Sequence, residues 1–251
     1  MTRANQATNF TLHAPTVESP EVIRQQVSYV DAVTAFDSAE SAGGYPEGYN
    51  GSFRQQREQR VVEQLIRQYP AGGHILDLPC GAGRGSQLLI QGGHRITAVD
   101  SSKHMVEKAR QIIATRHPAA MDRCEFVTGD AADTGFADES FDGVWCQRLF
   151  HHFHEPQTRI HVLSEFARLS RGPVIVSFAN SFALSVVAKR LKFAILGRDL
   201  GNYRPIPMST MVEEFQAAGL SVTLKQPVCW GMSRLWYVVG IPDAVSARKA
   251  G

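Results

Sequence analysis

The fold is decided by residues 74–86, HILDLPCGAGRGS. The apolar run that ends at Asp77 predicts a strand, a glycine-rich turn follows it, and the residues after the turn predict a helix over about 84–92. Glycine suits such a turn because it accepts positive φ and lets the backbone approach a ligand closely. The segment is therefore interpreted as the first half of a βαβ unit with a ligand at its turn, although a glycine-rich turn alone is a weak signal.

The same alternation of short apolar runs and helical patterns continues downstream, which is typical of a parallel sheet. The strands are expected near 74–78, 95–99, 124–128, 142–147 and 173–179, and the helices near 84–92, 103–116 and 156–170. A further helix opens at Ser209 and ends at Gly219, and two strand-like runs, LSVTLKQPVCW and SRLWYVVGI, follow it. These two must pair antiparallel, because a parallel crossover needs about a dozen residues or more.

The chain is expected to form one domain with additions. Residues 1–18 are polar and aperiodic, which predicts a mobile tail, and residues 19–70 predict a helical cap or lid. The cap begins with Ser19-Pro20-Glu21, which is typical of a helix start, and this first helix is expected to run to about Phe36. Residues 71–251 are expected to form the α/β domain, with a capping insertion at 181–208.

Three acidic residues stand at the ends of three successive strands, where ligands of open α/β sheets bind. Asp77 would repel the pyrophosphate of a dinucleotide but would suit a ligand with an ammonium and a sulfonium group. Asp100 can accept hydrogen bonds from two ribose hydroxyls, and Asp130 from an adenine amino group. Taken singly, Asp100 or Asp130 would be better explained as a helix cap or turn residue, but the three acids together indicate one ligand crevice.

On these motifs, the segment from about 54 to 179 resembles a class I S-adenosylmethionine-dependent methyltransferase of the broad small-molecule group that includes ubiquinone-type methyltransferases. The resemblance implies a Rossmann-like sheet of mostly parallel strands, with an antiparallel C-terminal pair and helices on both faces. It also implies S-adenosylmethionine as cofactor and S-adenosylhomocysteine as its product.

Carried over residue by residue, the resemblance implies a cofactor site along the strand ends. Its members are Asp77, Gly81 and Gly83 at the methionine moiety, Asp100, Ser101 and Met105 at the ribose and adenosine, Asp130 and Ala131 at the adenine, and Gln147 beside the cofactor. Pro79 departs from the family, which usually has its first glycine there, and proline lacks an N–H. Arg54 is expected either to pair with the methionine carboxylate or to be a solvated arginine on a helix face.

The segment QRLFHHFHEP follows the fourth strand, where the family places its substrate face. His151 and His152 are the candidate general bases for a hydroxyl acceptor, because histidine is the side chain best matched to neutral pH. The alternative is that these histidines only pack or cap a helix start. No metal site is predicted, because adjacent helical side chains diverge and no cysteine or carboxylate stands at metal spacing.

The insertion at 181–208 combines a basic and an apolar pattern. Lys189, Arg190, Lys192 and Arg198 alternate with large apolar residues. Such a stretch can lie on a membrane surface, here through 181–198, or cover an apolar and anionic substrate. An ordinary surface helix that packs onto the core is the third interpretation.

Composition limits the remaining function classes. The formal charge of +2 shows no excess of basic residues that would indicate a nucleic-acid partner. The absence of an N-terminal apolar stretch and the widely spaced cysteines predict a cytoplasmic protein, which would be peripheral at the inner membrane face if the insertion binds lipid. The preferred function is methylation, chiefly at oxygen, of a small or lipid-linked acceptor. A catalytically silent partner subunit and a nucleotide-dependent oxidoreductase are the alternatives, and the oligomeric state stays open.

Overall fold

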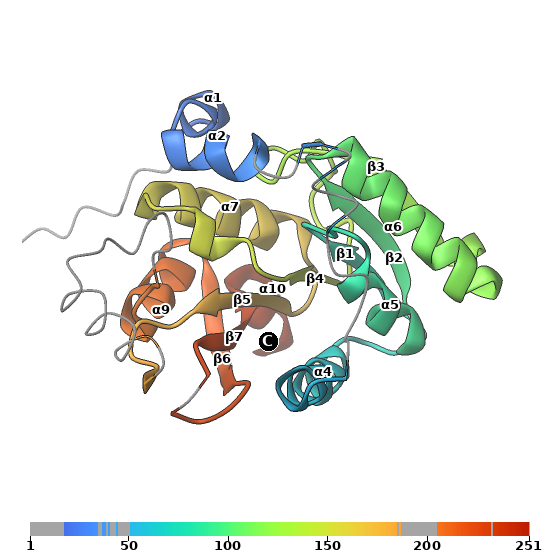
Figure 1. Cartoon of the computed structure of the whole chain (residues 1–251). Helices are drawn as coiled ribbons and strands as arrows, with labels where there is room; N and C mark the ends of the chain where they lie inside the picture. The colour runs from blue at the N-terminus through green and yellow to red at the C-terminus, as the bar shows by residue number, and fades with distance from the viewer. Residues whose placement is uncertain are drawn as a thin grey trace, which may run out of the picture.

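A computed structural model describes residues 18–34, 37–38, 40, 44, 51–184, 186, 205–231 and 233–250. Over these residues the chain forms an α/β domain in which helices cover both faces of a central sheet (Figure 1). The predicted mobile tail, apart from Glu18, lies outside the described residues.

The part of the sheet that the structure describes has seven strands in the order β3-β2-β1-β4-β5-β7-β6. They are β1 (His74–Asp77), β2 (Arg95–Asp100), β3 (Cys124–Thr128), β4 (Gly143–Cys146), β5 (Val174–Ala179), β6 (Leu220–Pro227) and β7 (Leu235–Pro242). The first five strands pair parallel, and β7 pairs antiparallel with both β5 and β6. This arrangement confirms the predicted sheet. Its strand order reverses at β1, and ligands bind at such reversals beside the carboxyl ends of the strands.

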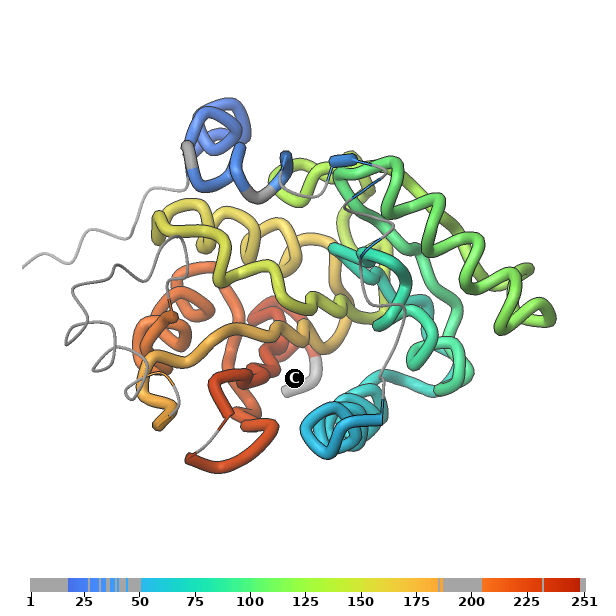
Figure 2. Tube along the Cα trace, viewed as in Figure 1, coloured from blue at the N-terminus to red at the C-terminus, as the bar shows by residue number. Residues whose placement is uncertain are grey.

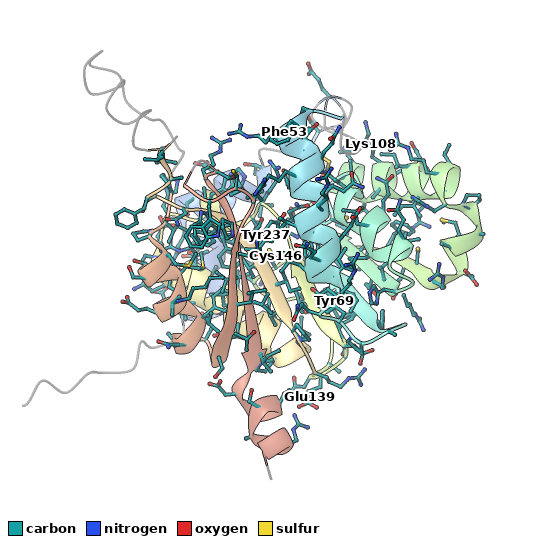
Figure 3. All side chains as sticks on the ribbon, turned by 90° about the horizontal axis from the view of Figure 1, so that it is seen from below. Phe53, Tyr69, Lys108, Glu139, Cys146 and Tyr237 are labelled. Carbon is teal, nitrogen blue, oxygen red and sulfur yellow. The ribbon has the colours of Figure 1, made fainter. Side chains whose placement is uncertain are left out.

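Alternate residues of the strands build one core on each face of the sheet. Leu76 of β1 and Val144 of β4 belong to the core on the side of α7 (Pro156–Leu169) and α9 (Met208–Ala217). Ile75 and Trp145 belong to the core on the other side. That side is covered by α4 (Phe53–Ile66), α5 (Arg84–Gln91) and α6 (Lys103–Arg116), and Figure 3 shows α4 crossing it from Phe53 toward Tyr69. Helices on both faces confirm the predicted layering.

The N-terminal helix differs from the prediction. Ser19 and Pro20 begin it as expected, but the segment forms two short helices, α1 (Pro20–Arg24) and α2 (Val27–Thr34). A turn at Gln25 and Gln26 separates them. This break lets α1 contact α7 while α2 contacts η2 (Phe150–His152), as the blue tube beside the yellow-green segment shows in Figure 2. Residues 19–34 therefore lie near the carboxyl edge of the sheet.

The other half of the predicted cap is part of the core. Helix α4 buries Val61, Val62 and Leu65 against the sheet layer, so it forms a structural layer of the domain. Two further elements complete the described chain, η1 (Pro118–Arg123) before β3 and α10 (Asp243–Ala250) after β7.

The insertion at 181–208 leaves and re-enters the domain at one place. The backbone N–H of Ser181 donates to Ile206 O at 3.0 Å, and the N–H of Ile206 donates to Ala179 O at 2.8 Å. Lys189, Arg190, Lys192 and Arg198 lie outside the described residues, so the structure does not test the predictions that rest on these four side chains. Where helices are described, each is too short or too polar to cross a membrane.

Candidate functional site

A cavity of about 310 Å³ opens at the carboxyl ends of β1, β2 and β4. Ten of the residues predicted from the sequence line it, namely Asp77, Pro79, Gly81, Asp100, Ser101, Met105, Ala131, Gln147, His151 and His152. Arg54, Gly83 and Asp130 are not among its lining residues. The fold thus gathers side chains from four separate stretches of sequence around one space of the size that small-molecule ligands occupy.

The glycine-rich turn is fixed by hydrogen bonds to the backbone and a side chain of β2. Pro79 follows a cis peptide bond, and the N–H of Cys80 donates to Val99 O at 2.8 Å. Gly81, at φ 51°, donates its N–H to Asp100 Oδ2 at 2.9 Å. Gly83 adopts φ 80° at the start of α5, and a Cβ there would lie 3.2 Å from Ala109 Cβ of α6. Gly83 is therefore needed for the left-handed turn before α5 and for the close packing of α5 against α6, and not for lining the cavity.

Two residues of the first turn of α5 belong to the site but were missed by sequence reasoning. A Cβ on Gly85 would lie 2.7 Å from Nε1 of the buried Trp145 and 3.3 Å from Asp77 Oδ1, so only glycine fits there. Ser86 Oγ donates to Asp77 Oδ2 at 2.5 Å. The signal for this contact was the third glycine of GAGRG, because a close helix–strand approach needs a residue without a side chain.

Asp77 is almost fully enclosed, with 1% of its surface exposed. Burial raises its pKa to about 7, the charge of Asp100 acts in the same direction, and the hydrogen bond from Ser86 opposes both. Burial has this effect because a low-dielectric surrounding disfavours the charged form. A cation bound beside Asp77 would favour ionisation, so the residue is suited to a positively charged ligand.

Asp100 connects the glycine-rich turn to the start of α6. Its Oδ2 accepts from Gly81, and its Oδ1 accepts from the N–H of Ser102 at 3.0 Å. Ser102 in turn caps α6 by accepting from the N–H of Met105 at 3.3 Å. Burial raises the pKa of Asp100, and the two backbone hydrogen bonds oppose that shift. The carboxylate is thus held in a fixed position at the wall of the cavity.

The carboxylate of Asp130 interacts with the N-terminal helices. It accepts from Arg24 Nε at 2.7 Å, from the N–H of Ala132 at 2.9 Å and from the hydroxyl of Tyr29. Tyr29 itself lines the cavity and stacks on Phe153 at 5.4 Å between ring centroids. An adenine amino group would share Asp130 with Arg24 and Tyr29, and the predicted adenine contact stays a prediction.

A buried carboxylate on α4 orients the residues that follow β4. Glu58 Oε1 accepts from Gln147 Nε2 at 3.1 Å, and both of its oxygens lie 2.8 Å from Arg148 Nη2. Gln147 Nε2 also donates to the hydroxyl of Tyr237 at 2.7 Å. Sequence reasoning chose Arg54 from this helix and missed Glu58. The sequence did hold a signal for Glu58, because a charged residue four positions before Val62 stands on the apolar side of the helix.

The two candidate bases lie together at the cavity. The rings of His151 and His152 are 4.2 Å apart between centroids. Burial lowers the pKa of His151 to about 3, and the charges of His152, Arg148 and Arg234 add to this shift. Burial also lowers the pKa of His152. Both imidazoles are therefore neutral near pH 7 and able to accept a proton, but His151 is a weak base in this surrounding.

Among the residues whose positions are described, no three His, Cys, Asp or Glu side chains are grouped so that they could hold a metal ion. The cavity instead has the acidic residues Asp77 and Asp100 on one side and Arg84 and Arg148, both paired with Glu58, on the other. These features favour organic ligands with opposite charges at their two ends.

Residues 75–172 match a family model described as a methyltransferase domain. A demethylmenaquinone methyltransferase from Clavibacter sepedonicus is 36% identical over 110 residues, which are 44% of this chain and 43% of that protein. A ubiquinone biosynthesis O-methyltransferase from Xanthomonas axonopodis pv. citri is 28% identical over 149 residues, 58% of this chain and 61% of that protein. The chain thus spans about half the length of the curated relatives it matches.

Solved structures show the same fold. The magnesium protoporphyrin IX methyltransferase from Synechocystis PCC 6803, with bound S-adenosylhomocysteine, is similar at a TM-score of 0.64 and 20% identity, covering 84% of this chain and 96% of that chain. A protein from Pyrococcus horikoshii OT3 is similar at a TM-score of 0.62 and 22% identity, covering 81% and 98%. These matches confirm the predicted Rossmann-like fold.

Proposed function

Since residues 75–172 form a domain of the class I S-adenosylmethionine-dependent methyltransferases, we propose that the chain transfers a methyl group from this cofactor to an oxygen of a small organic acceptor. The observation that carries the proposal is the meeting of Asp77, Asp100 and Gln147 at one cavity inside the matched domain. Relatives named as O-methyltransferases support the choice of oxygen.

The residues at the cavity fit the cofactor by charge and by shape. The buried carboxylate of Asp77 suits the ammonium of the methionine moiety, and that of Asp100 suits the ribose hydroxyls. Val33, Leu78 and Met105 add an apolar wall that suits the adenine ring. When bound, S-adenosylmethionine supplies an electrophilic methyl group.

The protein's own part in the reaction is alignment and the exclusion of water. Methyl transfer is an in-line displacement, and holding two reactants in line removes much of the entropic barrier. Gln147 and Arg148 are fixed by Glu58 beside the cavity, while Tyr29 and Phe153 enclose it with stacked rings. A neutral His151 or His152 can accept the proton of a hydroxyl acceptor.

Replacing His151 by alanine should lower turnover by about 10²-fold and leave cofactor affinity nearly unchanged, because a general base acts on the acceptor. Since its pKa is lowered to about 3, the imidazole loses its proton-accepting form only as the pH falls toward that value. The rate of the unchanged protein should therefore not fall between about pH 8 and 5 on account of His151. The measurement is the pH profile of steady-state turnover.

The matched control is His154→Ala, since His154 follows the same strand but does not line the cavity. Turnover at the level of the unchanged protein in His151→Ala, in His152→Ala and in the double variant would contradict the base assignment. A loss of cofactor affinity equal to the loss of turnover would instead make His151 a positioning residue.

Cofactor affinity should depend on pH through Asp77. Its pKa is raised to about 7, so below that pH the free protein carries a neutral carboxyl that must release a proton to pair with an ammonium. Affinity for S-adenosylhomocysteine should fall by up to about tenfold for each pH unit below 7. Calorimetric titration at several pH values measures this slope. Asp77→Asn should bind weakly at every pH and show no such slope, and an unaltered slope in this variant would exclude Asp77 as its source.

The proposed function is tested by binding and by turnover. Calorimetry should show saturable binding of S-adenosylhomocysteine and none of NAD, and S-adenosylmethionine with a panel of hydroxylated acids and quinols should give methylated products by mass spectrometry. Tight NAD binding would favour the oxidoreductase alternative. Cofactor binding without turnover on any acceptor, including metabolites extracted from the source cells, would favour a catalytically silent partner subunit.

A lipid-linked acceptor is a second form of the same proposal, and it rests on the basic and apolar sequence of 181–198. If this stretch meets anionic lipid, the protein should float with anionic liposomes and not with neutral ones. Replacing Lys189, Arg190 and Lys192 together by glutamine should abolish flotation. Equal flotation of the triple variant would exclude this stretch as the lipid contact.

A further inference from the structure

A second cavity, of about 110 Å³, adjoins the first one. The two cavities share Arg148 and His151 as lining residues. The second cavity reaches the end of β5 at Ala179 and the beginning of β7 at Leu235, away from Asp77 and Asp100. It therefore lies beyond the strands that carry the acidic residues, and it would stay open to an acceptor if the cofactor filled the first cavity.

The second cavity is rich in positive charge. Arg54 of α4, Arg148 after β4 and Arg234 before β7 line it. The one carboxylate among its described lining residues is Glu58, and that carboxylate already pairs with Arg148 and, at 3.3 Å, with Arg84. Positive charge in a partly enclosed space attracts an anion more strongly than it would at an open surface.

Arg148 is held at the junction of the two cavities by an unusual backbone. Its φ is 66°, and its N–H donates to Ser177 Oγ of β5 at 2.8 Å. A residue other than glycine keeps this left-handed conformation only where the surrounding structure imposes it, and such residues cluster at ligand sites. The two 2.8 Å contacts to Glu58 fix the guanidinium as well. The arginine is therefore preorganised before any ligand arrives.

The surroundings of His151 are consistent with a positively charged second cavity. Arg148, Arg234 and His151 all line the second cavity. Burial lowers the pKa of this imidazole most, and the charges of His152, Arg148 and Arg234 lower it further. An anion in the second cavity would offset the two guanidinium charges and so make His151 more basic. Binding of an acidic acceptor would thus also improve the candidate base.

We propose that the second cavity binds a carboxylate group of the methyl acceptor, with Arg54, Arg148 and Arg234 as its partners. This inference rests on the proposed function and specifies its substrate class as hydroxylated organic acids. Arginine suits the role because its planar group can donate two parallel hydrogen bonds to a carboxylate. A carboxylate held by arginines is a poor nucleophile, so it would anchor the acceptor. Because His151 lines both cavities, a hydroxyl of the same acceptor could reach the first cavity.

The test compares acids with their neutral amides on the full chain. The probes are 4-hydroxybenzoate against 4-hydroxybenzamide and 4-hydroxycinnamate against 4-hydroxycinnamamide, titrated at pH 7.5 with and without saturating S-adenosylhomocysteine. Each acid should bind at least about tenfold more tightly than its amide. Arg234→Gln should remove most of that preference while S-adenosylhomocysteine binds as before. Arg248→Gln, on the exposed α10, is the matched control and should retain the preference.

Equal binding of acids and amides, or no saturable binding of either acid, would overturn the inference. It would also be overturned if Arg234→Gln weakened S-adenosylhomocysteine binding tenfold, because the cavity would then hold the carboxylate of the cofactor. Failure of the unchanged protein to bind S-adenosylhomocysteine would count against the proposed function instead. The acid preference measured without that ligand decides the anion site independently.

Discussion

Replacing Asp100 by alanine should weaken the binding of S-adenosylhomocysteine by about 10²–10⁴-fold. The carboxylate lines the cavity and is proposed to accept two hydrogen bonds from the ribose, each worth about 1.5–3 kcal/mol when the acceptor is charged. The substitution also removes the acceptor for the N–H groups of Gly81 and Ser102, so the glycine-rich turn loses its link to α6. Calorimetric titration of each variant measures the effect.

Two controls separate binding from folding. Asp100→Asn keeps the shape of the side chain and one acceptor oxygen. Its affinity for S-adenosylhomocysteine should therefore lie between that of the unchanged protein and that of Asp100→Ala. Asp122→Ala removes an exposed carboxylate in η1 and should leave affinity unchanged. Thermal melting without ligand shows how much of the loss comes from the turn itself. Affinity within threefold of the unchanged protein in Asp100→Ala would refute the ribose contact.

The second large effect concerns a buried ion pair that supports the histidine segment. Arg159 of α7 and Glu214 of α9 are 5% and 3% exposed, with Nε–Oε2 at 2.9 Å and Nη2–Oε1 at 2.5 Å. Arg159 Nη1 also donates to the carbonyls of Phe153 and His154 at 2.8 and 3.0 Å. Replacing Arg159 by methionine should lower the free energy of unfolding by about 3–5 kcal/mol, because Glu214 would stay buried without a partner.

Urea unfolding measures this loss, and two variants test its cause. Arg159→Met with Glu214→Met should recover much of the stability, because replacing both charges with apolar groups removes the unpaired carboxylate. Arg248→Gln breaks the exposed pair with Glu139, which lies beside α10 in Figure 3, and should leave stability almost unchanged. A double variant as unstable as Arg159→Met would show that the cost comes from the lost contacts to Phe153 and His154.

The acidic wall of the site could be predicted because it follows from the sheet alone. Parallel strands in one sheet end at the same edge, so residues that close two neighbouring strands must meet there. Asp77 and Asp100 both close such strands, β1 and β2, and both line the cavity. The strand pattern was therefore enough to place these two side chains together, although they are far apart in the sequence.

The remainder of the site depends on contacts that no local pattern encodes. Glu58 and Gln147 are 89 residues apart in the chain, and Tyr29 and Asp130 are 101 apart. Each pair forms because a helix outside the βαβ repeat, α4 or α2, brings a side chain to the carboxyl ends of the strands. Side-chain contacts of that kind depend on tertiary packing, and hydrophobic periodicity gives only the buried face of the helix. The left-handed backbone of Arg148 has no signal in sequence for the same reason.

The meeting of the two ends of the 181–208 insertion bears on how this protein family can diversify. A backbone hydrogen bond joins Ser181 and Ile206, so the two ends of the insertion lie together. The position of these ends at the sheet therefore does not depend on the number of residues between them. Changing the length of such a loop costs little closure entropy, about 0.6 kcal/mol for each doubling. This stretch can therefore change in length or sequence over evolution while the strand ends that line the cavity keep their sequence, and under the proposed function such changes would alter which acceptors bind.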